Sequence, residues 1–160
     1  MAAEHICILS SVHLAFDVRL FQAEARTLAR AGFTVTVIAL EDTTQSETDG
    51  VRVISLPRPK NRLQRFWRTL RVLRLALAQP ADLYAFHDPE LLPVGVFLKL
   101  LRRRPVVYDV HEDVPSAIRG RTWLPPFLRL PVARLYRLFE RLALPFIDGL
   151  TLADYAYQRY

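Results

Sequence analysis

The sequence predicts a single α/β domain in which a parallel six-stranded sheet is covered by helices on both faces. Segments with strand character and segments with helical character alternate along all 160 residues, as is typical of parallel sheets with crossover helices. The composition, 51% hydrophobic and 24% charged, is that of one folded domain. Right-handed crossovers should place the carboxyl ends of the strands along one edge.

The first forty residues predict two strands joined by a helix. The apolar, partly β-branched run His5–Ser11 predicts a buried strand. Asp17 opens a stretch whose apolar residues recur at helical spacing, and Gly32 follows where a C-terminal cap is expected. The segment Phe33–Leu40, rich in valine and threonine, predicts the second strand.

The middle of the chain predicts a loop, a strand and a basic helix. Glu41–Gly50 is polar and predicts the loop, and Val51–Leu56 predicts the third strand. Residues 62–79 predict a helix with one apolar stripe, whereas Val72 and Leu75 fall on its arginine-rich outer side. That side could contact a membrane or a partner, or only solvent. The stripe consists of Leu63, Phe66, Trp67, Leu70, Leu73 and Leu77.

Two further strands enclose a third helix. Asp82–His87 and Pro105–His111 predict the strands. Asp88, followed by a proline and an acid, predicts the start of a helix that runs to about Arg103.

The last part of the chain predicts a loop, a helix and the sixth strand. Residues 114–127 contain several prolines and a glycine and predict an irregular loop. Leu128–Leu144 predicts a helix, Gly149–Ala153 predicts the sixth strand, and Asp154 is expected to start another helix.

Charge and cysteine content limit the setting. The formal net charge is +6, and residues 57–80 carry arginines and a lysine but no acid. Such a surface attracts anions, although a general preference for arginine on solvated faces explains it equally well. The single cysteine, Cys7, fits a reducing compartment, and neither a secretory signal nor a long apolar span is present. We expect a cytoplasmic protein, soluble or peripheral at the inner membrane face.

Polar residues gather where three of the predicted strands end. Ligands of open α/β sheets bind beyond the carboxyl ends of the strands, so these residues are candidates for a site. His111 is the one we favour for function, because it ends an apolar strand, precedes two acids and can offer a neutral imidazole. The candidates are Ser11, His13, Asp17, Arg19, His87, Asp88, Asp109, His111 and Glu112.

The other candidates have purely structural interpretations as well. Asp17 and Asp88 can cap helices, and Asp109 can anchor a loop, although an aspartate within a strand needs a partner. His87 fits a satisfied core histidine, and His13 fits a solvated loop residue. The five glycines form no GxGxxG motif and no phosphate loop, and neither a GxSxG elbow nor zinc-finger spacing is present.

Three blocks of sequence carry a resemblance: DVRLFQAEARTLARAGFTVTVIAL, DLYAFHDPELLPVGVFLKL and PVVYDVHEDVP. In order and spacing they resemble the N-terminal domain of family 4 glycosyltransferases of the GT-B fold, over nearly the whole chain. FHDPELLP and VVYDVHED are the more specific parts. The resemblance implies a Rossmann-like three-layer sandwich that forms one half of a GT-B fold.

The resemblance also implies a division of labour between two domains. In relatives the N-terminal domain mainly holds the acceptor, and the C-terminal domain holds the nucleotide-sugar across a cleft. The loop from Ser11 to Asp17 would line this cleft, and His111 would approach the reacting sugar. Retention of anomeric configuration and independence from metal are usual in the family, so we expect no resident metal or cofactor besides the nucleotide-sugar co-substrate.

Two departures from the family pattern affect these expectations. The loop after the first strand lacks the glycine pair of many relatives, although a sub-branch with an Asp-x-Arg pattern, here Asp17 and Arg19, is closer. The 160 residues also contain no donor-binding domain, which supplies much of the stabilisation of transition-state charge. We therefore expect a partner domain in cis or in trans, little or no activity of the chain alone, and self-association through an exposed cleft wall.

Two other functions stay open on the residues themselves. A non-catalytic module could bind an anionic surface through its arginines; aromatic and basic residues interleave only at Phe66–Trp67, so we expect no nucleic-acid partner. A metal-dependent hydrolase could draw its ligands from the strand ends. These ligands would be His87, Asp88, Asp109, His111, Glu112 and Asp113.

Overall fold

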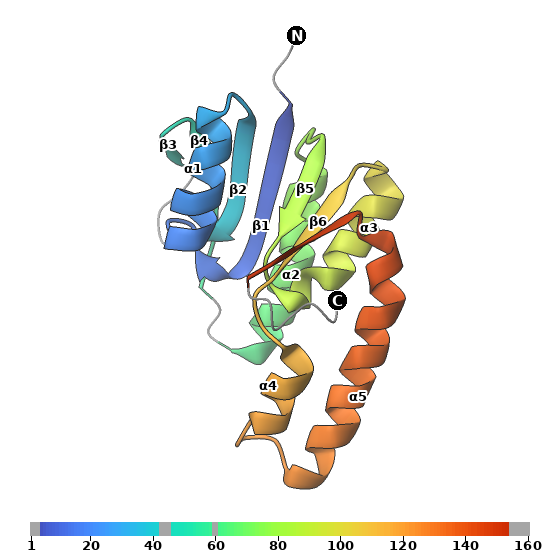
Figure 1. Ribbon diagram of the computed structural model, residues 1–160. Helices are drawn as coiled ribbons and strands as arrows, with labels where there is room; N and C mark the ends of the chain where they lie inside the picture. Colours follow the sequence, from blue (N-terminus) through green and yellow to red (C-terminus); the bar gives the residue numbers. More distant parts are fainter. Residues whose placement is uncertain (1–3, 42–45, 59–60, 154–160) are drawn as a thin grey trace.

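A seven-stranded, mostly parallel sheet forms the centre of the computed structural model, which describes residues 4–41, 46–58 and 61–153. The strand order is β3-β4-β2-β1-β5-β6-β7, so the order reverses beside β1 (Figure 1). The strands are β1 (His5–Leu14), β2 (Thr34–Leu40), β3 (Ser46–Thr48), β4 (Val51–Leu56), β5 (Leu83–Phe86), β6 (Val106–Val110) and β7 (Gly149–Leu152).

The six predicted parallel strands are confirmed, and the seventh strand lies within a predicted loop. The prediction of a loop over Glu41–Gly50 is wrong at β3, which pairs antiparallel with β4. Asp49 and Gly50 link the two strands with φ of 53° and 76°. This is the Asp-Gly turn of a tight hairpin, a signal that the polar composition of the segment concealed.

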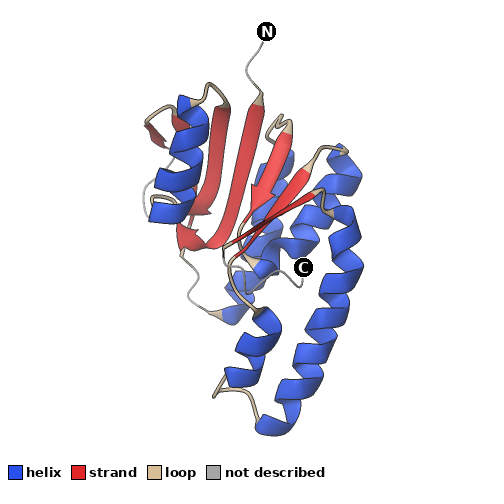
Figure 2. Cartoon of the chain, in the orientation of Figure 1, coloured by secondary structure: helices blue, strands red, loops and turns tan. Residues whose placement is uncertain are grey.

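Helices cover both faces of the sheet (Figure 2). One hydrophobic core contains residues of α2 and α3 packed on the sheet, and a second core on the opposite face contains residues of η1. The helical elements are η1 (Val18–Ala25), α1 (Arg26–Arg30), α2 (Arg62–Leu77), η2 (Pro89–Leu91), α3 (Leu92–Arg102), α4 (Val114–Gly120), α5 (Pro126–Ala143) and η3 (Leu144–Phe146). Within the described residues, no helix combines the length and the apolar character needed to cross a membrane.

The helix α4 corrects a second loop prediction, that of residues 114–127. Asp113 caps this helix, because its carboxylate accepts a hydrogen bond from the backbone N–H of Ser116 at 3.0 Å. Pro115 occupies the first turn, where a missing N–H has no cost. A proline taken as a loop signal is therefore a helix-start signal here. The further helix expected from Asp154 lies outside the described residues.

The helix α2 turns a different side to the sheet than its apolar stripe predicts. Val72 and Ala76 are fully buried, while Phe66 and Trp67 remain about 60% exposed. Small side chains allow the helix to approach the strands, whereas the bulky stripe extends sideways toward α3 and solvent. The predicted outward position of Val72 is wrong, and part of the stripe forms a surface.

Gly95 lets α3 pack tightly against β5. A Cβ atom at this position would lie 2.6 Å from Cε1 of Phe86 and 3.2 Å from Cδ1 of Ile147. Phe86 is fully buried and stacks on Tyr108 with ring centroids 4.6 Å apart, so its ring has no free direction in which to move. The glycine is required by this close approach.

We predict that Gly95→Ala destabilises the domain by about 1–3 kcal/mol, the usual cost of overpacking a filled core. Urea unfolding measures the change. Gly120→Ala is the matched control, because a Cβ there meets nothing within 4 Å. Equal stabilities for the two variants would contradict the tight packing of α3 on Phe86.

Candidate functional site

The carboxyl ends of β1, β5 and β6 lie next to one another, because β1 pairs with β5 and β5 with β6. The predicted juxtaposition of Ser11, His87 and His111 along one rim of the sheet is therefore confirmed. An irregularity in β1 between Leu9 and Leu14 bends the strand at the rim. The residues in this bend are those whose side chains and N–H groups meet the ends of the neighbouring strands.

Asp109 is the hub of the contacts beneath the rim. Asp109 is 7% exposed. Its carboxylate accepts hydrogen bonds from Arg19 Nε at 2.9 Å and from Arg19 Nη2 at 2.8 Å. Thr151 Oγ1 donates at 2.7 Å, and His87 Nδ1 lies 3.0 Å away. Burial raises the pKa of Asp109, but the hydrogen bonds from His87, Arg19 and Thr151 outweigh burial and hold this pKa far below its usual range.

His87 is buried between two carboxylates. Its Nε2 lies 2.7 Å from Glu24 Oε2, and its Nδ1 lies 3.0 Å from Asp109 Oδ2. Burial lowers the pKa of the imidazole, but the hydrogen bonds to Asp109 and Glu24 dominate and raise this pKa from 6.5 to about 9. His87 is thus a charged imidazolium at neutral pH and a structural centre, and it is too buried to line a cleft.

A single π-helical element supplies a partner to each of these two residues, Arg19 to Asp109 and Glu24 to His87. Arg19 and Glu24 both belong to η1, whose winding is marked by the hydrogen bond from the N–H of Arg26 to the carbonyl of Phe21. In an α-helix, residues five apart are rotated by about 140°. The wider π-helical turn reduces this angle, so both side chains reach the same end of the sheet.

Asp88 holds the bend of β1 in place. Its Oδ2 accepts hydrogen bonds from the hydroxyl of Ser10 at 2.8 Å and from the N–H groups of Ser11 and Val12. The interpretation of Asp88 as a helix cap is wrong, because its side chain makes no capping hydrogen bond to the helix that follows. A carboxylate that is 2% exposed is satisfied by the neighbouring strand instead.

His13 and His111 are the imidazoles at the open side of the rim. Both are half-buried, and their Nε2 atoms lie 3.4 Å apart. His111 Nδ1 lies 3.2 Å from the carbonyl oxygen of Asp109, which can only accept, so Nδ1–H donates and Nε2 carries the lone pair. His13 Nε2 also faces Asp88 Oδ1 at 3.4 Å. The pair therefore presents the Nε2 lone pair of His111 beside the His13 ring, whose Nε2 faces a carboxylate.

Among the residues that the structure describes, two sets of side chains have ligating atoms within 4.8 Å of one another, as a metal site requires: His13 with Asp88 and His111, and His87 with Asp109 and His111. In the second set both Asp109 oxygens already accept hydrogen bonds, and Arg19 adds a positive charge at 2.8 Å. That set is an ion-pair network. The first set retains Asp88 Oδ1 and two imidazoles as potential ligands.

The remaining predicted residues have supporting or separate positions. Asp17 caps η1 by accepting from the N–H groups of Arg19 and Leu20, which confirms its structural interpretation. Glu112 is half-buried, and none of the contacts described above includes it. Four residues outside the predicted set also contribute: Ser10, Glu24, Thr151 and Glu90, whose Oε1 accepts a hydrogen bond from Ser11 Oγ at 2.7 Å. Only Glu24 has a signal in the sequence, since an acid there interrupts the apolar stripe of its helix.

Comparisons with known proteins agree with this fold. Residues 19–158 match the glycosyl transferase 4-like domain family. The chain belongs to this family. Sucrose-phosphate synthase from Thermosynechococcus elongatus has a similar fold, with a TM-score of 0.64 and 14% sequence identity over 92% of this chain. The chain spans 41% of that structure's length. No curated protein shows significant sequence similarity to the present chain.

We predict that His87→Gln removes most of the pH dependence of stability in the neutral range. The pKa of His87 is raised on folding from 6.5 to about 9, so its stabilisation is complete below pH 6.5 and is lost as pH rises through 9. At about 1.4 kcal/mol per pH unit, this shift corresponds to about 3 kcal/mol. Urea unfolding at intervals between these limits measures the slope.

His5→Gln is the control for this slope, because the His5 ring contacts the uncharged hydroxyl of Thr36 at 2.9 Å. Cys7 is common to all three proteins, so the slope that its unfolded thiol adds toward pH 9, because burial raises the thiol pKa in the folded protein, cancels in the comparison. A His87→Gln variant with the wild-type slope would show that the imidazolium is not the titrating group.

Proposed function

We propose that this domain binds the acceptor in a glycosyltransferase that moves a sugar from a nucleotide-sugar to a glycan or lipid-linked acceptor. The observation that carries the proposal is the His13–His111 pair, half-buried at the rim and supported from below by the buried network of Asp109. Family membership supports the reaction class. The assignment of the acceptor to this rim rests on the position of the pair.

The geometry supports separate roles for the two imidazoles. The Nε2 lone pair of His111 accepts a hydrogen bond from a sugar hydroxyl and orients it toward the donor. His13, whose Nε2 faces Asp88 Oδ1, borders the same ligand and limits where its hydroxyl can lie. Both rings are fixed by buried groups, so little rotamer freedom is lost when the ligand binds.

The donor side belongs to a second domain in this proposal. That domain, in cis or in trans, binds the nucleotide-sugar and stabilises the charge that develops on the leaving diphosphate. The acceptor domain positions the acceptor and contributes no metal ion. Alone it binds acceptor and turns over little or none.

A metal-dependent hydrolase is the second candidate, favoured by the set His13, Asp88 and His111, whose ligating atoms lie within 4.8 Å of one another. Metal analysis after dialysis separates the two functions. A stoichiometric ion that is lost in His13→Ala supports the hydrolase, whereas a metal-free protein that binds glycans supports the acceptor domain.

We predict that the chain binds a subset of glycans on an array without any nucleotide, and that His111→Ala weakens this binding about tenfold, as expected for the loss of a hydrogen bond at an oriented site. His5→Ala is the matched control, because His5 lies at the opposite end of β1 from Ser11. Binding is measured by titration with the best array ligand.

Two results would contradict the proposal. One is a chain that binds no glycan although its melting is cooperative. The other is equal affinity of His111→Ala and wild type for the same glycan. In the enzyme completed by its donor domain, the same substitution should lower kcat, which a purely structural residue would not do at unchanged stability.

A further inference from the structure

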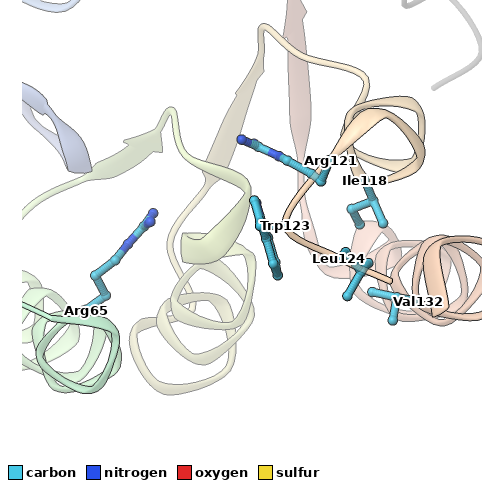
Figure 3. A pocket seen from close by; sticks show the side chains of 6 residues that line it. All are labelled: Arg65, Ile118, Arg121, Trp123, Leu124 and Val132. Atoms are coloured by element: carbon cyan, nitrogen blue, oxygen red, sulfur yellow. The ribbon is translucent and has the colours of Figure 1, made fainter. Parts of the chain in front are cut away.

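Two hollows next to the rim share one arginine. The first, about 470 Å³, lies between α2 and the α4–α5 segment, with Arg65 on one side and Arg121 and Trp123 on the other (Figure 3). The second, about 430 Å³, runs between α2 and α3 and is lined mainly by apolar side chains, among them Phe66, Leu70 and Phe97. We call them the basic hollow and the apolar groove.

At one end of the apolar groove, positively charged side chains outnumber negatively charged ones. Arg65 Nη2 lies 2.8 Å from Glu90 Oε2, and Arg68 Nη2 lies 3.6 Å from Glu90 Oε1, so two guanidinium groups share one carboxylate. Arg121 faces Arg65 across the basic hollow (Figure 3). If Arg65 turns to an anion, Glu90 keeps Arg68 as its partner. Guanidinium groups bind phosphate oxygens through paired hydrogen bonds, and Arg65 and Arg121 each bring one such group to the basic hollow.

A chain of contacts joins this charge to the imidazole pair. Glu90 Oε1 accepts a hydrogen bond from Ser11 Oγ at 2.7 Å. The N–H of Ser11 donates to Asp88, whose other oxygen faces His13. Glu90 therefore borders the apolar groove, pairs with Arg65 and Arg68, and contacts the strand end that carries His13.

We infer that the acceptor is an amphipathic molecule with a phosphate between an apolar chain and the sugar-accepting end. The chain lies along Phe66, Leu70 and Phe97, the phosphate between Arg65 and Arg121, and the accepting hydroxyl at the imidazole pair. This inference rests on the proposed function and specifies its substrate class. It also explains why bulky apolar residues of α2 face solvent, since a bound chain would cover them.

Binding of dodecyl phosphate below its critical micelle concentration tests the inference. The chain has two tryptophans, Trp67 and Trp123, so Trp67→Phe leaves Trp123, which borders the basic hollow, as the sole reporter. We expect saturable quenching or a spectral shift on titration. In this background Arg121→Ala and Leu70→Ser should each weaken binding about tenfold.

Matched controls lie outside both hollows. Arg74→Ala removes an exposed arginine elsewhere on α2, and Leu135→Ser removes a leucine that is 67% exposed on α5. Both should bind dodecyl phosphate like the parent. Thermal melting of every variant separates loss of binding from loss of folding.

Three results would overturn the inference. Dodecyl maltoside or inorganic phosphate that binds as well as dodecyl phosphate would remove the need for both parts of the ligand. Binding to vesicles of anionic lipid without binding to the monomer would indicate a membrane surface. Glycan binding that needs His111 but is accompanied by no alkyl phosphate binding would leave the proposed function standing and overturn this inference alone.

Discussion

The carboxylate of Asp109, buried near the carboxyl end of β6, constrains the groups at the rim of this domain. A buried aspartate is stable only when it is charged and paired, or neutral and hydrogen-bonded. Here the charged form pairs with Arg19 of η1, with His87, which directly follows β5, and with Thr151 of β7. One side chain thus fixes the positions of three elements relative to β6. Because its partner His87 is itself held by Glu24, the network is closed within the protein.

Because the buried network of Asp109 is satisfied within the protein, the half-buried pair of His13 and His111 can remain accessible at the rim. His111 takes its orientation from the carbonyl of Asp109, and His13 takes its orientation from Asp88, so neither ring depends on a ligand to be ordered. The two half-buried imidazoles can therefore exchange partners with a ligand at small entropic cost. The same division appears at the apolar groove, where Arg68 is 5% exposed and Arg65 is nearly half exposed beside one shared Glu90.

In helix α2, the side that packs against the sheet decides which residues form the surface. Its sequence carries two faces that could meet the sheet, one with bulky apolar residues and one with Val72 and Ala76 between arginines. The sheet takes the small residues, because they permit close approach, and Arg68 is buried as a consequence. The bulky face then borders α3 and forms the apolar groove. A hydrophobic stripe is therefore no guarantee of burial when a smaller face competes with it.

The sequence by itself determined the alternation of strands and helices, the parallel sheet and the rim where Ser11, His87 and His111 meet. Local pattern suffices for these features, because periodicity fixes each element and right-handed crossovers fix where strand ends lie. Only the tertiary structure decided which polar residues pair. The partners of His87 and Asp88 come from residues 22 to 78 positions away in sequence. Long-range pairing of buried charges leaves no periodic trace in a single sequence.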